Sequence, residues 1–333
     1  MWDCVHTMSQ LVYLDTAPAM YRGGILNIER FCGYYLDEPD GKAFLRMRFG
    51  NIESEYLHWK ELLGTAAQVY GDWAITDILN DNAPLQSGFY GCAFKSPDGP
   101  DVLAFRGSEM LGNPLYKNDY KNDLALGYEP KTPQHKMLDR FWWRIDPAAY
   151  SRGFYVTGHS LGGNLALYAA VTLPERVRGG LISCVAFNAP GFNHEFIREN
   201  AEGIGKAKAL TVSIQNEYDI VSSLLESPVE PLIASSQIHP GNAPAIVDIM
   251  YPHSNFMFAR DENGGFIKSE SGEKSRLCKL IERISGMFLR LPRIIRHEVC
   301  GLVLDELYRE PSPEQAKRYA LVALSKYLTG RPV

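Results

Sequence analysis

Apolar residues follow two different spacings along the chain, and the changes of spacing divide it into elements. Residues 56–80 carry apolar side chains at helical spacing, which predicts one or two helices. The β-rich runs 87–95 and 101–108 flank the turn SPDGP, so they predict a hairpin. A polar, glycine-dotted loop is expected over 108–131, after which Thr132 and Pro133 are typical of a helix start.

The middle of the chain alternates between strand and helix patterns. Strands are expected at 153–157, 181–187 and 208–215, and helices at 161–172 and around 194–200. Alternating strands and helices predict parallel βαβ units, and strands that are nearly all apolar are typical of a sheet covered on both faces. We therefore expect an α/β fold of the α/β-hydrolase kind. Its central sheet is mostly parallel, with helices on both faces and extra helices at both ends.

The remaining segments predict how this single domain, 1–333, is organised. The catalytic core is expected at about 85–270. Residues 222–250 are interrupted by prolines yet carry apolar residues, which favours a lid or cap there, with 108–131 as the other candidate. From 273 to 333 the pattern is helical, with a break near Pro292 and a last helix at about 312–328.

Composition narrows the possible functions. The 333 residues are 45% apolar and 22% charged, with a net charge of −5 and no basic block, which argues against nucleic acid as a partner. The six cysteines lie far apart and match no metal or redox spacing, so neither a metal nor another cofactor is expected. The N-terminus lacks a signal-peptide pattern and no run of apolar residues is long enough to span a bilayer, so a cytoplasmic location is expected.

The most informative motif is Gly158-His159-Ser160-Leu161-Gly162, which fits G-x-S-x-G. The run GFYV before it predicts a buried strand, and NLALYAA after it favours a helix. A serine at the apex of a strand–turn–helix is the nucleophile elbow, in which glycines two residues away allow strand and helix to pass closely. Ser160 is therefore the candidate nucleophile, and the alternative is a tight turn without chemistry.

The order serine, acid, histidine expected for this fold selects the candidate base. His159 is the neighbour of Ser160 and is expected to point elsewhere. His253, in a short loop after the possible lid, is favoured over His239, which precedes Pro240 inside it. His297 lies in a charged helical segment, where a solvated or capping role is expected.

Asp219 is the candidate acid because it lies just past the carboxyl end of a predicted strand, where α/β sites form. Glu217 is the near competitor. Asp248 and Asp261 come later in the chain, and neither is well placed relative to the end of a predicted strand. The Leu161 backbone N–H is expected to bind the oxyanion together with Ser108, which could supply its N–H and its hydroxyl. Gly107 allows the backbone to approach closely there.

Several motifs in the same order resemble the class 3, fungal-type lipase branch of the α/β-hydrolases. The matching runs are VLAFRGS, DYKNDLAL, VTGHSLGGNLALYAA, FNAPG, YDIVSSL and HSN. SQLVYLDTA and the hairpin are more similar still to a bacterial lipase class 3-like family. The match covers about 85–255, and it departs from the lipases at the tryptophan expected before the aspartate loop, where Tyr120 stands.

The resemblance implies an ester hydrolase with Ser160, Asp219 and His253 as its triad, with Ser108 and Leu161 as its oxyanion pair. It also puts Asp123 at the aspartate of the downstream loop. The substrate is expected to be a small-molecule or lipid ester. The alternatives are an inactive hydrolase-fold binding protein, or a phospholipase or thioesterase acting at a membrane surface. Apolar residues alternating with arginines in 288–299 fit peripheral membrane contact, although packing on the core is favoured. The oligomeric state stays open.

Overall fold

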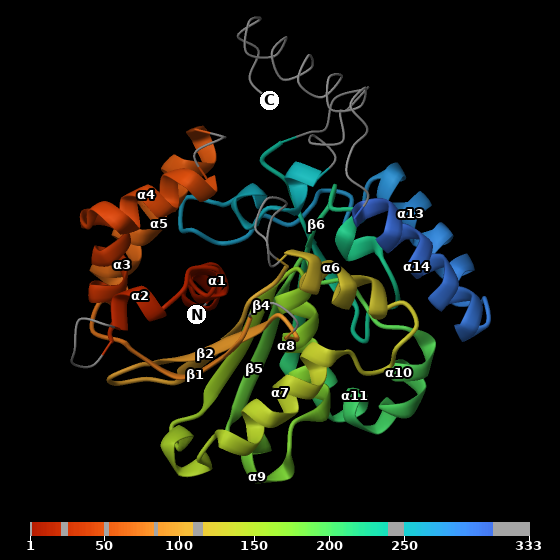
Figure 1. The fold of residues 1–333 in the computed structure, drawn as a ribbon, viewed down its shortest axis with the longest axis horizontal. Helices are drawn as coiled ribbons and strands as arrows, with labels where there is room; N and C mark the ends of the chain where they lie inside the picture. Colours follow the sequence, from red (N-terminus) through yellow and green to blue (C-terminus); the bar gives the residue numbers. More distant parts are fainter. Residues whose placement is uncertain are drawn as a thin grey trace, which may run out of the picture.

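A seven-stranded sheet forms the centre of the molecule (Figure 1). The computed structural model describes residues 2–20, 26–49, 53–82, 86–108, 116–238 and 250–308. The strands lie in the order of the chain, with β1 and β2 antiparallel to their neighbours and β3 to β7 parallel. Their bounds are β1 Ala74–Asp81, β2 Phe89–Lys95, β3 Asp101–Phe105, β4 Phe154–His159, β5 Leu181–Phe187, β6 Thr211–Asn216 and β7 Pro231–Ala234.

Helices cover both faces of this sheet and create an apolar core on each (Figure 1). The N-terminal helices pack on one face, where Val5, Phe31 and Val185 share a core. These helices are α1 Trp2–Leu11, α2 Ala17–Met20, α3 Ile28–Asp37, α4 Pro39–Phe49 and α5 Glu53–Tyr70. On the other face, Leu138 and Leu165 pack against Val156. The helices there are α7 Pro133–Arg144, α8 Leu161–Thr172, α9 Glu175–Arg178, α10 His194–Glu199 and α11 Ala201–Ala207.

Most of the predicted elements are confirmed. The hairpin is β2 and β3, and the expected strand–helix alternation is β4, α8, β5, α10 and β6. The N-terminus of α7 is a capping box: the Thr132 hydroxyl accepts from the His135 N–H, and the His135 Nδ1 accepts from the Thr132 N–H. Together with the extra helices at both ends, this mostly parallel sheet is the expected α/β-hydrolase fold.

The helical prediction for 56–80 is wrong in its second half, where β1 forms the edge of the sheet. A β-bulge between Thr76 and Leu79 interrupts the pairing with β2, and Asp77 within it has a φ of 48°. The bulge breaks the strict alternation of a strand, so the apolar residues of β1 acquire a helix-like spacing.

Two expected loops also contain regular structure. The segment 108–131 includes α6 Tyr116–Ala125, and 222–250 includes β7, which pairs in parallel with β6. Residues 231–234 are therefore part of the sheet rather than of a lid. The rest of that segment from 239 to 249, which includes His239 and Asp248, lies outside the described residues.

The C-terminal part is helical, as expected, and breaks at Pro292. α13 spans Arg276–Leu289 and α14 spans Arg293–Tyr308, at the edge of the molecule beside α6 (Figure 1). The last helix predicted at 312–328 lies outside the described residues. Within the described part of the chain, every helix is too short or too polar to cross a bilayer.

Candidate active site

Ser160 occupies a sharp turn at the carboxyl edge of the sheet, between β4 and α8. Its φ of 59° and ψ of −130° are strained for a residue with a side chain. A Cβ on Gly158 would lie 2.1 Å from the Gly162 carbonyl oxygen, and one on Gly162 would lie 2.2 Å from that of Phe105. Both glycines are thus required by close backbone contact, as expected for a nucleophile elbow.

Three side chains from three loops meet at this turn. The Oγ of Ser160 lies 2.8 Å from Nε2 of His253, and Nδ1 of the same imidazole lies 3.0 Å from Oδ1 of Asp219. Asp219 is fully buried, and the Ser160 residue is 8% exposed. The structure therefore brings together the three residues that the sequence selected as nucleophile, base and acid.

The surroundings of Asp219 determine the tautomer of His253. Burial alone would raise the pKa of Asp219, but the His253 charge and hydrogen bond, with other donors, hold it below its ordinary value. The carboxylate also accepts from the backbone N–H groups of Val221 and Ser222, each 3.0 Å away. The ionised carboxylate accepts from Nδ1–H, which leaves Nε2 free to accept the Ser160 proton.

The competing candidates have other partners. Glu217 accepts from the Ser236 N–H and the Ser269 hydroxyl. His297 packs edge-on against Tyr128, with ring centroids 4.8 Å apart. Asp261 closes its own turn by accepting from two backbone N–H groups. None of these three side chains contacts Ser160 or His253 through a hydrogen bond in the described part of the chain.

His159 contributes to the site in a way that the sequence did not suggest. Its side chain points toward His253 rather than elsewhere: Nε2 lies 2.6 Å from the His253 carbonyl oxygen. A carbonyl only accepts, so Nε2 carries the proton. Burial lowers the pKa of His159 to about 3, so the ring is neutral and Nδ1 accepts from the Tyr13 hydroxyl, 3.0 Å away.

Asn188 holds the same carbonyl from a second direction. Its Nδ2 donates to the His253 oxygen at 3.0 Å, and its Oδ1 accepts from the Asn216 N–H at 2.8 Å. Asn188 directly follows β5 and adopts a φ of 46°, which asparagine tolerates better than most residues. The base-bearing loop is therefore tied to the ends of β4, β5 and β6.

Lys274 supports the loop that follows Asp219. Its buried ammonium donates to the Ser222 carbonyl at 2.8 Å and to the Ser223 hydroxyl at 2.9 Å, and it lies 3.4 Å from Glu282. Its positive charge is among the influences that lower the Asp219 pKa. No sequence motif marked Lys274, because it lies far along the chain from the acid.

The oxyanion candidates lie on two sides of the turn. Leu161 opens α8, so its N–H points from the positive end of a helix. The loop with Ser108 approaches so closely that a Cβ on Gly107 would lie 2.4 Å from the His159 carbonyl oxygen. The Ser108 hydroxyl donates to Asp123 Oδ2 at 2.6 Å, and burial raises the Asp123 pKa to about 6.

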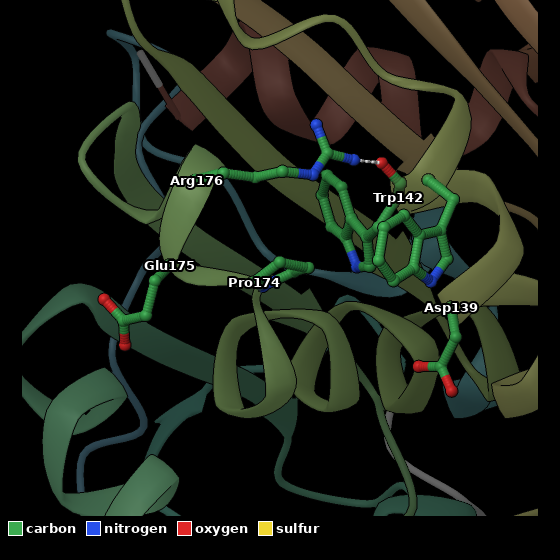
Figure 2. A pocket seen from close by; sticks show the side chains of 6 residues that line it. Asp139, Trp142, Pro174, Glu175 and Arg176 are labelled. Carbon is green, nitrogen blue, oxygen red and sulfur yellow. Dashed lines mark hydrogen bonds between the residues drawn. The ribbon is translucent and has the colours of Figure 1, made fainter.

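A separate pocket of about 380 Å³ lies beyond the other end of α8 from Ser160. Pro174 and Arg176 line it just beyond the C-terminus of α8, a helix about 18 Å long whose N-cap is Ser160. Figure 2 shows Arg176 donating to the Trp142 carbonyl beside it. This pocket takes no part in the chemistry around Ser160. Across the described ranges, no group of three histidine, cysteine or acidic side chains could hold a metal ion.

The mostly parallel sheet and the serine elbow at its carboxyl edge define a lipase-like protein of the α/β-hydrolase fold. Residues 69–250 match the profile of the Mbeg1-like family. The match covers more than half of the chain, so the protein belongs to the Mbeg1-like family. No curated protein matches the sequence.

Solved structures with a similar chain course include three lipases. LipA, an extracellular lipase from Serratia marcescens, is 16% identical, with a TM-score of 0.35 over 68% of this chain and 40% of LipA. Rhizomucor miehei lipase is 16% identical, with a TM-score of 0.32 over 55% of this chain and 66% of the lipase. The lipase of Rhizopus microsporus var. chinensis is 13% identical, with a TM-score of 0.35 over 64% of this chain and 76% of the lipase.

Proposed function

We propose that this protein is a serine hydrolase that cleaves carboxylic esters through an acyl-enzyme on Ser160. The observation that carries the proposal is the hydrogen-bonded chain from Ser160 through His253 to Asp219, with distances of 2.8 and 3.0 Å. A serine hydroxyl is a weak nucleophile unless an adjacent base takes its proton. A buried, ionised carboxylate behind the base stabilises the imidazolium that forms.

The proposed reaction has two halves. His253 Nε2 takes the Ser160 proton while Oγ attacks the ester carbonyl, and the tetrahedral oxyanion forms between the N–H groups of Leu161 and Ser108. Collapse of this intermediate breaks the ester bond, and His253 protonates the departing alcohol. Water then attacks the acyl-enzyme and gives a proton to His253. That proton returns to Ser160 as the carboxylic acid leaves.

The proposed reaction defines the substrate class. Small acyl esters and lipid esters both offer the carbonyl that Ser160 would attack, and a lipase or esterase activity is the reading that the α/β-hydrolase fold supports. We favour an ester with an apolar acyl chain. A series of p-nitrophenyl esters of increasing chain length tests this choice: kcat/KM is expected to rise beyond acetate, and a maximum at acetate would contradict it.

A fluorophosphonate probe tests the reaction class, because it reacts covalently with an activated serine. The native protein is expected to be labelled, and Ser160→Ala is expected to lose both labelling and hydrolysis. Ser151→Ala, which changes an exposed serine in another loop, is the matched control and keeps both. Absence of labelling in the native protein, or equal labelling of Ser160→Ala, would show that Ser160 is not the nucleophile.

A further inference from the structure

α13 has two apolar faces, and only one of them packs against the protein. On the inner face, Cys278, Ser285 and Leu289 are buried, and the Ser285 hydroxyl accepts from the Leu225 N–H at 2.7 Å. The outer face, as we call it, is the row of exposed apolar residues that recurs at helical spacing along α13 and just past its end. It consists of Leu277, Leu280, Ile284, Met287 and Leu291, with exposures of 41, 51, 48, 59 and 40%.

A row of arginines borders the outer face. Arg276, Arg283 and Arg290 each directly precede one of its apolar residues and are separated by two helical turns, so they share one side of α13. All three are exposed, and no carboxylate among the described residues lies within ion-pair distance of them. The neighbouring carboxylate, Glu282, pairs with Lys274 instead. Among the described residues, the border of the outer face is therefore positively charged and without an ion-paired carboxylate, although the whole chain is acidic.

α14 extends the exposed apolar surface. Ile294 and Leu302 are 69% and 70% exposed, and Ile295, Val299 and Val303 are exposed as well. On its inner side, Arg296 is buried and donates to the Gly127 carbonyl and to Glu195. The helix is thus fixed to the body of the protein while its apolar side chains face outward. The sequence favours packing of residues 288–299 on the core. In the structure, only the inner sides of α13 and α14 pack there.

We propose that the outer face of α13, continued by α14, docks on an anionic lipid bilayer. An amphipathic helix binds a membrane surface when its apolar side enters the interface and flanking cations meet acidic headgroups. Both components are present here: the apolar row inserts, and the three arginines supply the charge complementarity. This inference is independent of the proposed ester hydrolysis, because it rests on surface residues alone.

α13 also contacts elements that lie next to the candidate active site. α13 begins two residues after Lys274, which holds the loop behind Asp219, and Phe288 packs on Gly127 near the end of α6. The inner side of α13 therefore adjoins the loop that carries the acid, and its C-terminal end lies near the end of α6, the helix that contains Asp123.

Vesicle co-sedimentation of the full chain tests the proposal. The native protein is expected to bind vesicles of phosphatidylcholine mixed with phosphatidylglycerol, and to bind pure phosphatidylcholine at least about tenfold more weakly. The double variant Leu280→Glu, Ile284→Glu is expected to lose binding about tenfold or more, as is the variant with Arg276, Arg283 and Arg290 changed to glutamine. Thermal unfolding confirms that each variant is folded.

A matched control carries the same chemical change elsewhere. Met47 and Leu57 are exposed apolar residues of α4 and α5, so Met47→Glu, Leu57→Glu is expected to bind anionic vesicles like the native protein. No binding by the native protein, or equal binding by the α13 variants, would overturn the proposal. Self-association that disappears in Leu280→Glu, Ile284→Glu, without vesicle binding, would also overturn it and assign the face to a second copy of the chain.

Discussion

The imidazole of His159 donates a hydrogen bond to the backbone carbonyl of His253, with Nε2 2.6 Å from the oxygen. The neighbour of the candidate nucleophile thus holds the loop that carries the candidate base. The Tyr13 hydroxyl fixes the opposite ring nitrogen of His159, so the N-terminal segment also supports this contact. The distance between Ser160 and His253 therefore depends on His159 and Tyr13, which are far apart in the sequence.

Replacing His159 tests this positioning role. His159→Phe keeps a ring in the buried space but removes the donor, so the His253 loop is expected to shift. Misplacing a catalytic group by about 1 Å can cost up to a hundredfold, so kcat is expected to fall about tenfold to a hundredfold with KM little changed. Steady-state ester hydrolysis measures this change. His297→Phe is the control, because His297 packs on Tyr128 and makes no hydrogen bond to the triad among the described residues. An unchanged kcat in His159→Phe would contradict the role.

Ser108→Ala separates the two donors that this residue offers. The single hydroxyl proton of Ser108 is directed at Asp123 Oδ2, so only the backbone N–H is left for the oxyanion. Loss of an oxyanion donor costs about a hundredfold to a thousandfold in kcat, whereas Ser108→Ala keeps the N–H. We expect kcat to fall by less than about tenfold. A loss of about a hundredfold or more would show that the hydroxyl itself binds the oxyanion.

Asp123→Asn is expected to change the pH dependence of folding. Burial raises the Asp123 pKa from its ordinary 3.8 to about 6, so the folded state retains this proton longer than the unfolded state. The associated stability is fully present below the ordinary pKa and is lost as the pH rises through about 6. The two pKa values differ by the equivalent of about 3 kcal/mol.

Asparagine resembles the neutral carboxyl at every pH. Asp123→Asn is therefore expected to gain stability relative to the native protein as the pH rises from 4 to 8, by at most about 3 kcal/mol. Urea denaturation at several pH values measures the difference. Asp146→Asn, which alters a carboxylate that caps an exposed turn, serves as the control. If Asp123→Asn and the native protein differ in stability by the same amount at pH 4 and at pH 8, the raised pKa of Asp123 is contradicted.

The site residues that can be predicted from the sequence are those whose neighbours along the chain form a recognisable pattern. Ser160 stands out because the strand, glycines and helix around it are contiguous, and Asp219 because it follows a strand end. The helical prediction fails at β1 because the bulge of this strand disrupts the alternation of apolar and polar residues. Tyr13 and Lys274 were missed for a different reason: each reaches the site through a contact between distant parts of the chain. Nothing in their immediate sequence distinguishes them from ordinary surface or core residues.

Lys274→Met tests whether the buried ammonium positions the acid loop. Methionine fills a similar volume but cannot donate to the Ser222 carbonyl or the Ser223 hydroxyl. The loop after Asp219 is expected to loosen, and kcat is expected to fall about tenfold. Because the lost charge helps to lower the Asp219 pKa, the acid limb of the kcat/KM profile should move to higher pH.

The charge-conserving variant separates the electrostatic role of Lys274 from a structural one. Lys274→Arg retains a cation at this position, so the acid limb of its pH profile is expected to stay at the native pH even if stability declines. In Lys274→Met, both the stability and the profile are expected to change. A profile that stays in place in Lys274→Met, with only the free energy of unfolding reduced, would mean that the lysine holds the fold together and does not tune Asp219. The comparison is informative because Lys274 acts on the reaction only through Asp219 and His253. Among the hydrogen bonds of the described residues, Lys274 contacts neither His253 nor Ser160 directly.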